Sequence, residues 1–330
     1  MYEAFFKFHT KPFDLVPNPA FLFLSKSHKK ALTYLDYGIR ERVGFILLTG
    51  EVGSGKTTII RDLIKKHHEK VVISKIFNTR VNSEQLIALI NDDFGISVEG
   101  KDKTSMLRDL NDFLVEQYAR GNFPVLIIDE AQNLNSKLLE EIRMLSNLET
   151  DSSKLLQIIL VGQPELRETM NSPGLRQLRQ RISINCHLKP LSRDETEQYI
   201  LHRLEVAGNR EAVSFMPGSI DIIYSSSRGV PRLINIFCDF LLISAFAEET
   251  DTIEESMATD VIGELDLDQH FWQSDGFEKS TSNNQKSPIE NQEQPGEITQ
   301  ILKTISRRLD TLEKDTRNSS DSIVREFWQK

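Results

Sequence analysis

A glycine-rich stretch that begins at Gly50 has the residue types needed to hold a triphosphate. It reads GEVGSGKT and follows an apolar run. Glycine permits the tight turn in which backbone N–H groups point at phosphate, and the following helix adds its positive N-terminal dipole. We expect Lys56 to contact the β- and γ-phosphates and the Thr57 hydroxyl to ligate Mg²⁺. The residues predicted to bind ATP are Gly50, Glu51, Val52, Gly53, Ser54, Gly55, Lys56, Thr57 and Thr58.

A second stretch, VLIIDEAQNL, ends an apolar run with two adjacent carboxylates, Asp129 and Glu130. Phosphoryl transfer depends mainly on positioning and charge neutralisation. We therefore expect Asp129 to hold Mg²⁺ together with Thr57, and Glu130 to polarise the attacking water. An acidic pair at the end of a strand can also simply cap a helix. The glycine-rich loop in the same chain favours hydrolysis.

Two polar residues end other apolar runs and are further candidates for the same site. Gln163 follows QIILVG and could report whether a γ-phosphate is present. Asn78 ends the run that begins at Val71, and it could bond Glu130 and restrain it until a partner binds. An asparagine at such a position also commonly forms a turn, so the role of Asn78 stays open.

Arginines occur at two places where they could reach phosphate. Their charge is permanent and their geometry suits phosphate oxygens. The segment LRQLRQRI contains Arg176, Arg179 and Arg181, and the segment RGVPRLIN contains Arg232. We expect Arg232 to approach the γ-phosphate of its own subunit. One of the first group, with Arg181 ranked before Arg176, is expected to reach a neighbouring subunit. The alternative is a set of surface arginines paired with acids.

The elements that must position these residues follow from the alternation of apolar strands with amphipathic helices. This pattern predicts an α/β fold with a parallel sheet covered on both faces. Ligands bind at the carboxyl ends of the strands in such sheets, where Asp129 and Gln163 are expected. The predicted strands are 45–49, 71–77, 125–128, 156–161 and 182–188, and the predicted helices between them are 56–66, 83–94 and 104–120.

The remainder of the chain divides into a flanking segment, a helical domain and a polar extension. Ser192 followed by Glu195 is a capping-box signature, and the pattern after Leu188 is wholly helical. A polar stretch then predicts disorder. A final amphipathic segment predicts a tail helix, either for docking or as a solvated extension. The predicted divisions are 1–43 (nucleotide-flanking), 44–187 (ATPase), 188–266 (helical lid), 267–297 (disordered linker) and 298–330 (tail helix).

Composition excludes some classes of protein. A net charge of −9 disfavours a sequence-independent nucleic-acid binder, which needs a basic face. Cys186 and Cys238 form no metal-spaced pair, which favours a reducing compartment. The N-terminus lacks the pattern of a signal peptide, and no apolar run approaches the roughly 20 residues of a membrane span. We expect a cytoplasmic protein, with a peripheral location at the inner face of the membrane as the alternative.

Taken together and in this order, the motifs resemble those of AAA+ ATPases, specifically the general secretion pathway protein A group. The resemblance implies a P-loop αβα sandwich followed by a helical lid. It also implies sensor roles for Gln163 and Arg232, and an N-terminal segment around Pro12, Phe13 and Pro19 on the adenine side. The blocks that carry it are MYEAFFKFHTKPFDLVPNPAFLFLS, GFILLTGEVGSGKTT, VLIIDEAQNL, LVGQPELRE, LRQLRQRI, LKPLSRDETEQYILHRL and GVPRLINIFCD.

The sequence departs from that group in two respects. Asn18 stands where the group usually has Asp. The longer members carry a membrane span and a periplasmic peptidoglycan-binding module after the ATPase, whereas here a polar linker and a short helix follow. On this ground the chain looks more like the short, soluble relatives associated with exosortase and exopolysaccharide-export systems.

Three functions are compatible with these features. The favoured one is Mg²⁺-dependent ATP hydrolysis coupled to the assembly or regulation of an envelope export system, by a homo-oligomer with a protein partner. The second is a DNA-associated ATPase of the transposition-helper type, which shares the P-loop, the DEAQ motif and the lid. The third is an ATP-dependent scaffold with little turnover, against which Glu130 argues.

Overall fold

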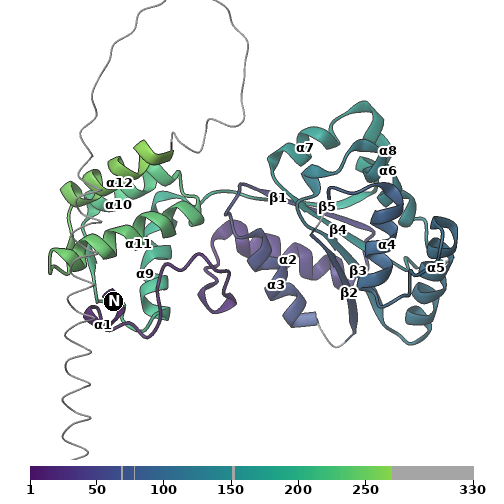
Figure 1. Cartoon of the computed structure of the whole chain (residues 1–330), viewed down its shortest axis with the longest axis horizontal. Helices are drawn as coiled ribbons and strands as arrows, with labels where there is room; N and C mark the ends of the chain where they lie inside the picture. The colour runs from purple at the N-terminus through teal and green to yellow at the C-terminus, as the bar shows by residue number, and fades with distance from the viewer. Residues whose placement is uncertain (68–69, 78, 151–152, 270–330) are drawn as a thin grey trace, which may run out of the picture. The chain divides into compact units, whose positions relative to one another are not determined.

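The structure is a computed structural model that describes residues 1–67, 70–77, 79–150 and 153–269. Five parallel strands form its central sheet, in the order β2-β3-β4-β1-β5 (Figure 1). Strands β1, β3 and β4 are buried along their whole length, as expected for apolar strands covered on both faces. The strands are β1 (Phe45–Gly50), β2 (Val71–Ile76), β3 (Phe123–Ile128), β4 (Gln157–Gly162) and β5 (Ile182–Leu188).

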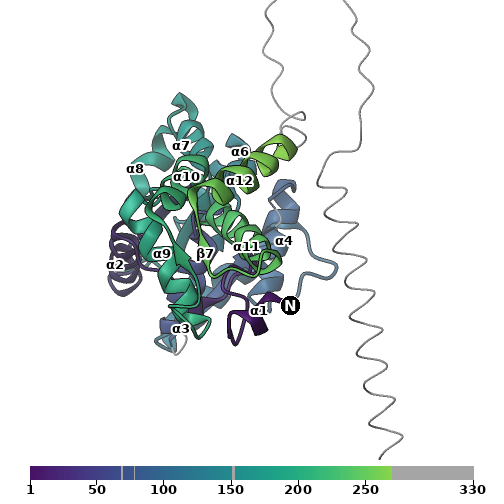
Figure 2. The same ribbon diagram turned by 90° about the vertical axis from the view of Figure 1, so that its left-hand side faces the viewer.

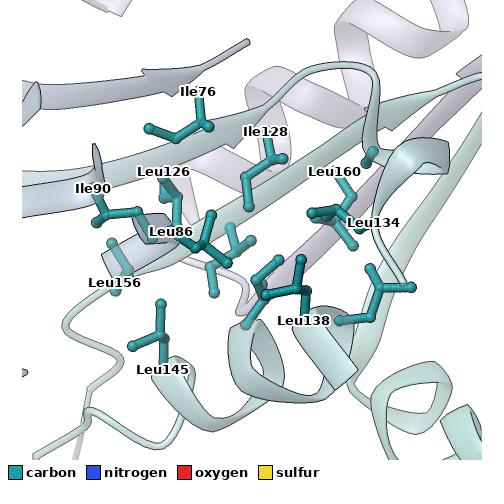
Figure 3. Packing of buried hydrophobic residues seen from close by; sticks show 14 of the residues in the cluster. Ile76, Leu86, Ile90, Leu126, Ile128, Leu134, Leu138, Leu145, Leu156 and Leu160 are labelled. Atoms are coloured by element: carbon teal, nitrogen blue, oxygen red, sulfur yellow. The ribbon is translucent and has the colours of Figure 1, made fainter. Parts of the chain in front are cut away.

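Helices cover both faces of this sheet. On one face α2 (Lys26–Arg40) and α3 (Lys56–His67) pack through residues such as Leu35 and Ile59, which are fully buried. The other face is covered by α4 (Ser83–Asp93), α5 (Lys103–Ala119), α6 (Ser136–Leu145), α7 (Pro164–Met170) and α8 (Arg176–Arg181). Figure 3 shows apolar side chains of β2, β3 and β4 packed with those of α4 and α6 on this second face. The predicted P-loop α/β fold is confirmed.

The strand order brings the predicted chemistry to one edge. Because β4 lies between β1 and β3, the carboxyl ends of these three strands are adjacent. The glycine-rich loop follows β1, Asp129 follows β3 and Gln163 follows β4.

Strand β3 begins at Phe123, earlier than predicted, and so includes Pro124. A proline is tolerated there because the pairing of β3 with β4 starts only at Val125, so no ladder hydrogen bond to β4 is lost.

A second core is formed by the helical domain. It contains α9 (Arg193–Val206), α10 (Pro217–Ser227), α11 (Pro231–Ala247) and α12 (Glu255–Gln269), which Figure 2 shows grouped around β7 (Thr252–Ile253). The capping box at Ser192 is present, with Ser192 N donating to Glu195 Oε2 at 3.1 Å and Glu195 N donating to Ser192 Oγ at 3.2 Å. The expectation of a wholly helical domain was wrong in one detail, because β6 (Ser214–Phe215) pairs with β7. Two-residue strands are too short to produce a periodic pattern.

The N-terminal segment packs mainly with the helical domain, although Arg61 of α3 also donates to Pro17 O at 3.0 Å. Its aromatic residues Phe6, Phe8 and Phe13 join the core of α9–α11, and the backbone of His9 donates to Ala207 O at 2.8 Å. The segment contains α1 (Tyr2–Phe5) and the 3₁₀ turn η1 (Pro19–Phe21). Helix α2, by contrast, belongs to the sheet domain. Residues 270–330, and with them the predicted tail helix and nearly all of the predicted linker, lie outside the described residues.

Within the described ranges, none of the helices combines the length and apolar character that crossing a bilayer would require. The most apolar one, α11, is a core helix whose Phe237, Cys238 and Leu241 are fully or almost fully buried.

Candidate functional site

The glycine-rich loop has the backbone of a phosphate-binding turn. Gly53 and Gly55 adopt φ angles of +78° and +91°, values that residues with side chains rarely adopt. Space is a second reason for glycine. A Cβ on Gly53 would lie 2.3 Å from the Cβ of Arg232, and one on Gly55 would lie 3.0 Å from Nε2 of His28. Helix α3 begins at Lys56, so its positive N-terminal end faces the loop.

Lys56 is held inside this loop. Its Nζ donates to Gly50 O at 2.8 Å and to Glu51 O at 2.9 Å, and the residue is only 7% exposed. Burial lowers the pKa of the Lys56 ammonium, and the nearby carboxylates of Glu130 and Asp129 oppose this shift. An ammonium group with few waters around it and carbonyl oxygens as partners is ready to exchange those partners for phosphate oxygens.

Thr57 and Asp129 lie side by side and could offer two oxygen ligands to a divalent cation. The Thr57 hydroxyl lies 3.4 Å from Asp129 Oδ2, and Asp129 is 5% exposed. The other carboxylate oxygen, Oδ1, accepts the backbone N–H of Glu130 at 3.0 Å. A hydroxyl and a carboxylate are oxygen ligands of the kind that Mg²⁺ prefers, so the residues present fit this ion.

Glu130 is exposed at the edge of the site and is held by two side-chain amides. Its Oε2 accepts Nε2 of Gln132 at 2.5 Å and Nε2 of Gln163 at 3.2 Å. The residue has a left-handed backbone, with φ 51° and ψ 38°, which is uncommon outside glycine. Its carbonyl oxygen accepts the hydroxyl of buried Thr79 at 3.2 Å. Gln163, expected beside the γ-phosphate, is thus also a direct neighbour of Glu130, whereas Asn78 lies outside the described residues.

The predicted arginines are in different environments. Arg232, in the first turn of α11, is exposed and lies against Gly53. Arg181 donates through Nη1 to Ser146 Oγ at 2.6 Å, and Arg179 donates through Nη1 to Met170 O at 2.9 Å. Arg176, at the first position of α8, is exposed. Because Arg181 is bonded within the same chain, Arg176 becomes the better candidate for contact with a neighbouring subunit.

A pocket of about 380 Å³ adjoins the glycine-rich loop. The loop and Glu130 line one side, and helical-domain residues that include Tyr199, Arg203 and Arg232 line another. The N-terminal segment contributes residues 14–18 and 21–23. This is the segment around Pro12, Phe13 and Pro19, which the resemblance implies on the adenine side. Phe13 itself packs in the core of the helical domain, with 1% of its surface exposed.

Arg203 fixes the N-terminal segment in that position. Its Nε donates to Pro12 O, its Nη2 donates to Asp14 O at 3.1 Å, and its guanidinium lies 4.7 Å from the centre of the Phe21 ring. Asn18 starts η1 by accepting the N–H of Ala20 at 3.0 Å. An aspartate would accept the same hydrogen bond, so the departure at Asn18 leaves this turn intact.

Three residues of this region were missed from the sequence. His28 is 4% exposed and lies under the loop, with Nε2 3.0 Å from Ser54 O. Burial lowers its pKa. Arg203 and Gln132 are the others. Gln132 lies inside the VLIIDEAQNL motif, but only the fold brings it to Gln163. His28 and Arg203 lie in no recognisable chemical motif, and their partners are distant in the chain.

Comparisons with known proteins show which family and fold this chain resembles. A family model described as an AAA domain matches residues 39–170. General secretion pathway protein A of Aeromonas hydrophila is 41% identical over 278 residues, which cover 83% of this chain and 50% of that protein. The chain thus spans about half the length of this relative.

Solved structures share the fold at low identity. The ORC2 protein of Aeropyrum pernix in its ADP form has a TM-score of 0.58 at 20% identity, covering 78% of this chain and 73% of that one. An ORC structure from Drosophila has a TM-score of 0.56 at 16% identity, covering 77% of this chain and 64% of that one. At such identities the likeness concerns the fold alone.

Proposed function

We propose that this chain hydrolyses ATP with Mg²⁺ at the edge of the sheet described above. Its match to an AAA domain and its similarity to general secretion pathway protein A support this proposal. The observation that carries this proposal is the juxtaposition of Thr57, Asp129 and Glu130 beside the phosphate-binding loop. A nucleotide-binding scaffold would need the loop and the cation ligands, but it would not need the exposed carboxylate of Glu130, the residue after Asp129.

Each residue has a distinct role in the proposed reaction. The loop N–H groups and Lys56 hold the β- and γ-phosphates, while Thr57 and Asp129 hold Mg²⁺, which when bound neutralises charge on the phosphate oxygens. Glu130 orients a water and accepts its proton as the water oxygen bonds to γ-phosphorus. The bond from γ-phosphorus to the bridging oxygen breaks, leaving ADP and phosphate. Arg232 and Gln163 contact the γ-phosphate and report its loss to the helical domain.

We further propose that hydrolysis is coupled to an envelope export system of the secretion or exopolysaccharide/exosortase type. The similarity to general secretion pathway protein A supports this. We propose a cytoplasmic location, with a peripheral location at the inner face of the membrane as the alternative. A protein partner then belongs to that system. The net charge of −9 argues against a DNA-associated ATPase as the alternative.

Hydrolysis by the whole chain, with and without DNA, tests this proposal. We expect phosphate release that requires Mg²⁺ and that does not change when duplex or single-stranded DNA is added at low ionic strength. The control is the same assay with EDTA. Strong stimulation by DNA would favour the transposition-helper alternative, and Mg²⁺-dependent binding without turnover would favour the scaffold.

We propose that the active form is a homo-oligomer in which an arginine of one subunit completes the site of the next. Such an arginine can raise phosphoryl transfer by roughly 10³–10⁵. Arg176 is the better candidate, because it is exposed, whereas Arg181 is bonded to Ser146.

Mixing two inactive variants is expected to recover part of the activity. At an ATP concentration too low to fill its weakened site, Lys56→Ala supplies only Arg176. Arg176→Ala holds ATP but lacks the arginine, so a mixed assembly contains some complete sites. Phosphate release is measured across mixing ratios, and mixtures with Arg181→Ala provide the matched comparison. If no mixture recovers activity while both variants still assemble with wild type, the contribution of Arg176 from a neighbour is refuted.

A further inference from the structure

Gln132 connects two strand ends through one side chain. Its Nε2 donates to Glu130 Oε2 at 2.5 Å, while its Oε1 accepts the backbone N–H of Gln163 at 3.1 Å. Gln163 precedes Pro164, the first residue of α7, so this second bond fastens the end of β4 to the turn after β3. The amide of Gln132 thus binds the backbone of Gln163 through its oxygen and the carboxylate of Glu130 through its nitrogen.

The absence of a side chain at Gly162 lets the Gln132 amide come close to the end of β4. A Cβ on Gly162 would lie 2.9 Å from Gln132 Oε1, so a larger residue at the end of β4 would push the amide away. Gln132 itself is half-buried in the 3₁₀ turn η2 (Ala131–Asn133). A side chain held at a turn and bonded at its acceptor end has little freedom to move its donor end.

The same arrangement restricts Glu130. Both amide donors, from Gln132 and from Gln163, reach the same oxygen, Oε2. Among the residues that the structure describes, none donates a hydrogen bond to Oε1. Within the described part of the chain, Oε2 is therefore engaged by the protein, and Oε1 is left to accept from a water.

We propose that Gln132 is a positioning residue, which holds the Glu130 carboxylate so that one oxygen binds the protein and the other faces the attacking water. This inference rests on the proposed function, because it needs Glu130 to act on water. Gln132 itself does not touch the reacting atoms. Its contribution is orientation, and a displacement of about 1 Å in such a group can lower a rate by roughly 10²-fold.

Gln132→Glu distinguishes the role of Gln132 in orienting Glu130 from its role in binding the backbone of Gln163. The new side chain has the same shape and still accepts the N–H of Gln163, but it no longer donates to Glu130. We expect kcat for ATP to fall roughly 10- to 100-fold, with ATP affinity and the midpoint of thermal unfolding unchanged. Asn133→Asp is the matched control, since it adds the same charge at an exposed neighbouring residue and should keep wild-type kcat. Gln132→Leu adds no charge and serves as the second variant, including if Gln132→Glu fails to fold.

A double-mutant cycle with Glu130→Gln makes the test decisive. If Gln132 acts through Glu130, either Gln132 substitution should lower kcat no further in the Glu130→Gln background. An equal fall in both backgrounds would mean a merely structural role, and unchanged or raised kcat in the single variants would also overturn the proposal. Wild-type turnover by Glu130→Gln alone would instead refute the proposed role of Glu130, so the two failures are distinguishable.

Discussion

Glu130→Gln is expected to lower ATP turnover by roughly 10²–10⁴-fold, the range typical of a lost general base, while leaving ATP binding intact. The amide retains the shape of the carboxylate but cannot accept a proton from water. Binding should persist because the groups proposed to hold the phosphates and Mg²⁺, Lys56, Thr57 and Asp129, are unchanged. Titration with a fluorescent nucleotide measures binding, and phosphate release measures turnover.

Controls for this prediction come from the neighbouring acid and from stability. Asp129→Asn removes a proposed cation ligand, so it should raise the Mg²⁺ concentration needed for half-maximal turnover. Glu130→Gln should leave that concentration unchanged. Thermal unfolding should be unaffected in Glu130→Gln, whose side chain is exposed. Wild-type turnover by a folded Glu130→Gln would remove this residue from the mechanism.

Lys56→Ala is expected to weaken ATP binding by roughly 10- to 150-fold, because hydrogen bonds to charged groups contribute about 1.5–3 kcal/mol. Lys56 is buried against the loop carbonyls, and it is the one basic residue in the stretch GEVGSGKT, so no other side chain of the loop can replace its charge. Isothermal titration with a non-hydrolysable ATP analogue measures the change.

A charge-preserving variant distinguishes charge from geometry at this position. Lys56→Arg keeps the positive charge, but its planar fork is wider than the ammonium and should not fit between Gly50 O and Glu51 O. We therefore expect it to bind ATP poorly as well. Unchanged affinity in Lys56→Ala, with folding verified, would contradict the assignment of this loop as the triphosphate site.

Much of the fold could be predicted from the sequence. The runs that form β1, β3 and β4 are almost entirely apolar because these strands are buried on both faces, and that pattern is visible without a structure. The resemblance to AAA+ proteins is confirmed by the AAA-domain match and by the relative that is 41% identical. The motif residues meet because parallel strands present their carboxyl ends at a common edge.

Other features depend on contacts that leave no local pattern. Nothing in the segment that contains Phe6 and Phe13 indicates that its partners are helices about 200 residues later in the chain, as the Asn209–Phe6 hydrogen bond illustrates. The bond from Arg181 to Ser146 is equally invisible in the sequence, although it decides which arginine is available to a neighbour. The same is true of the Gln132 amide, whose partners are set by the position of β4 beside β3.

The most direct test of the central claim is the fate of ATP bound to the whole chain in a single turnover. Radiolabelled ATP is mixed with excess protein and Mg²⁺, quenched with acid at increasing times, and separated from ADP. For the wild-type chain we predict conversion of bound ATP to ADP and phosphate, and for Glu130→Gln we predict that bound ATP is recovered largely intact. Recovery of intact ATP from the wild-type chain under conditions that permit assembly, or equal conversion by the two proteins, would contradict the account.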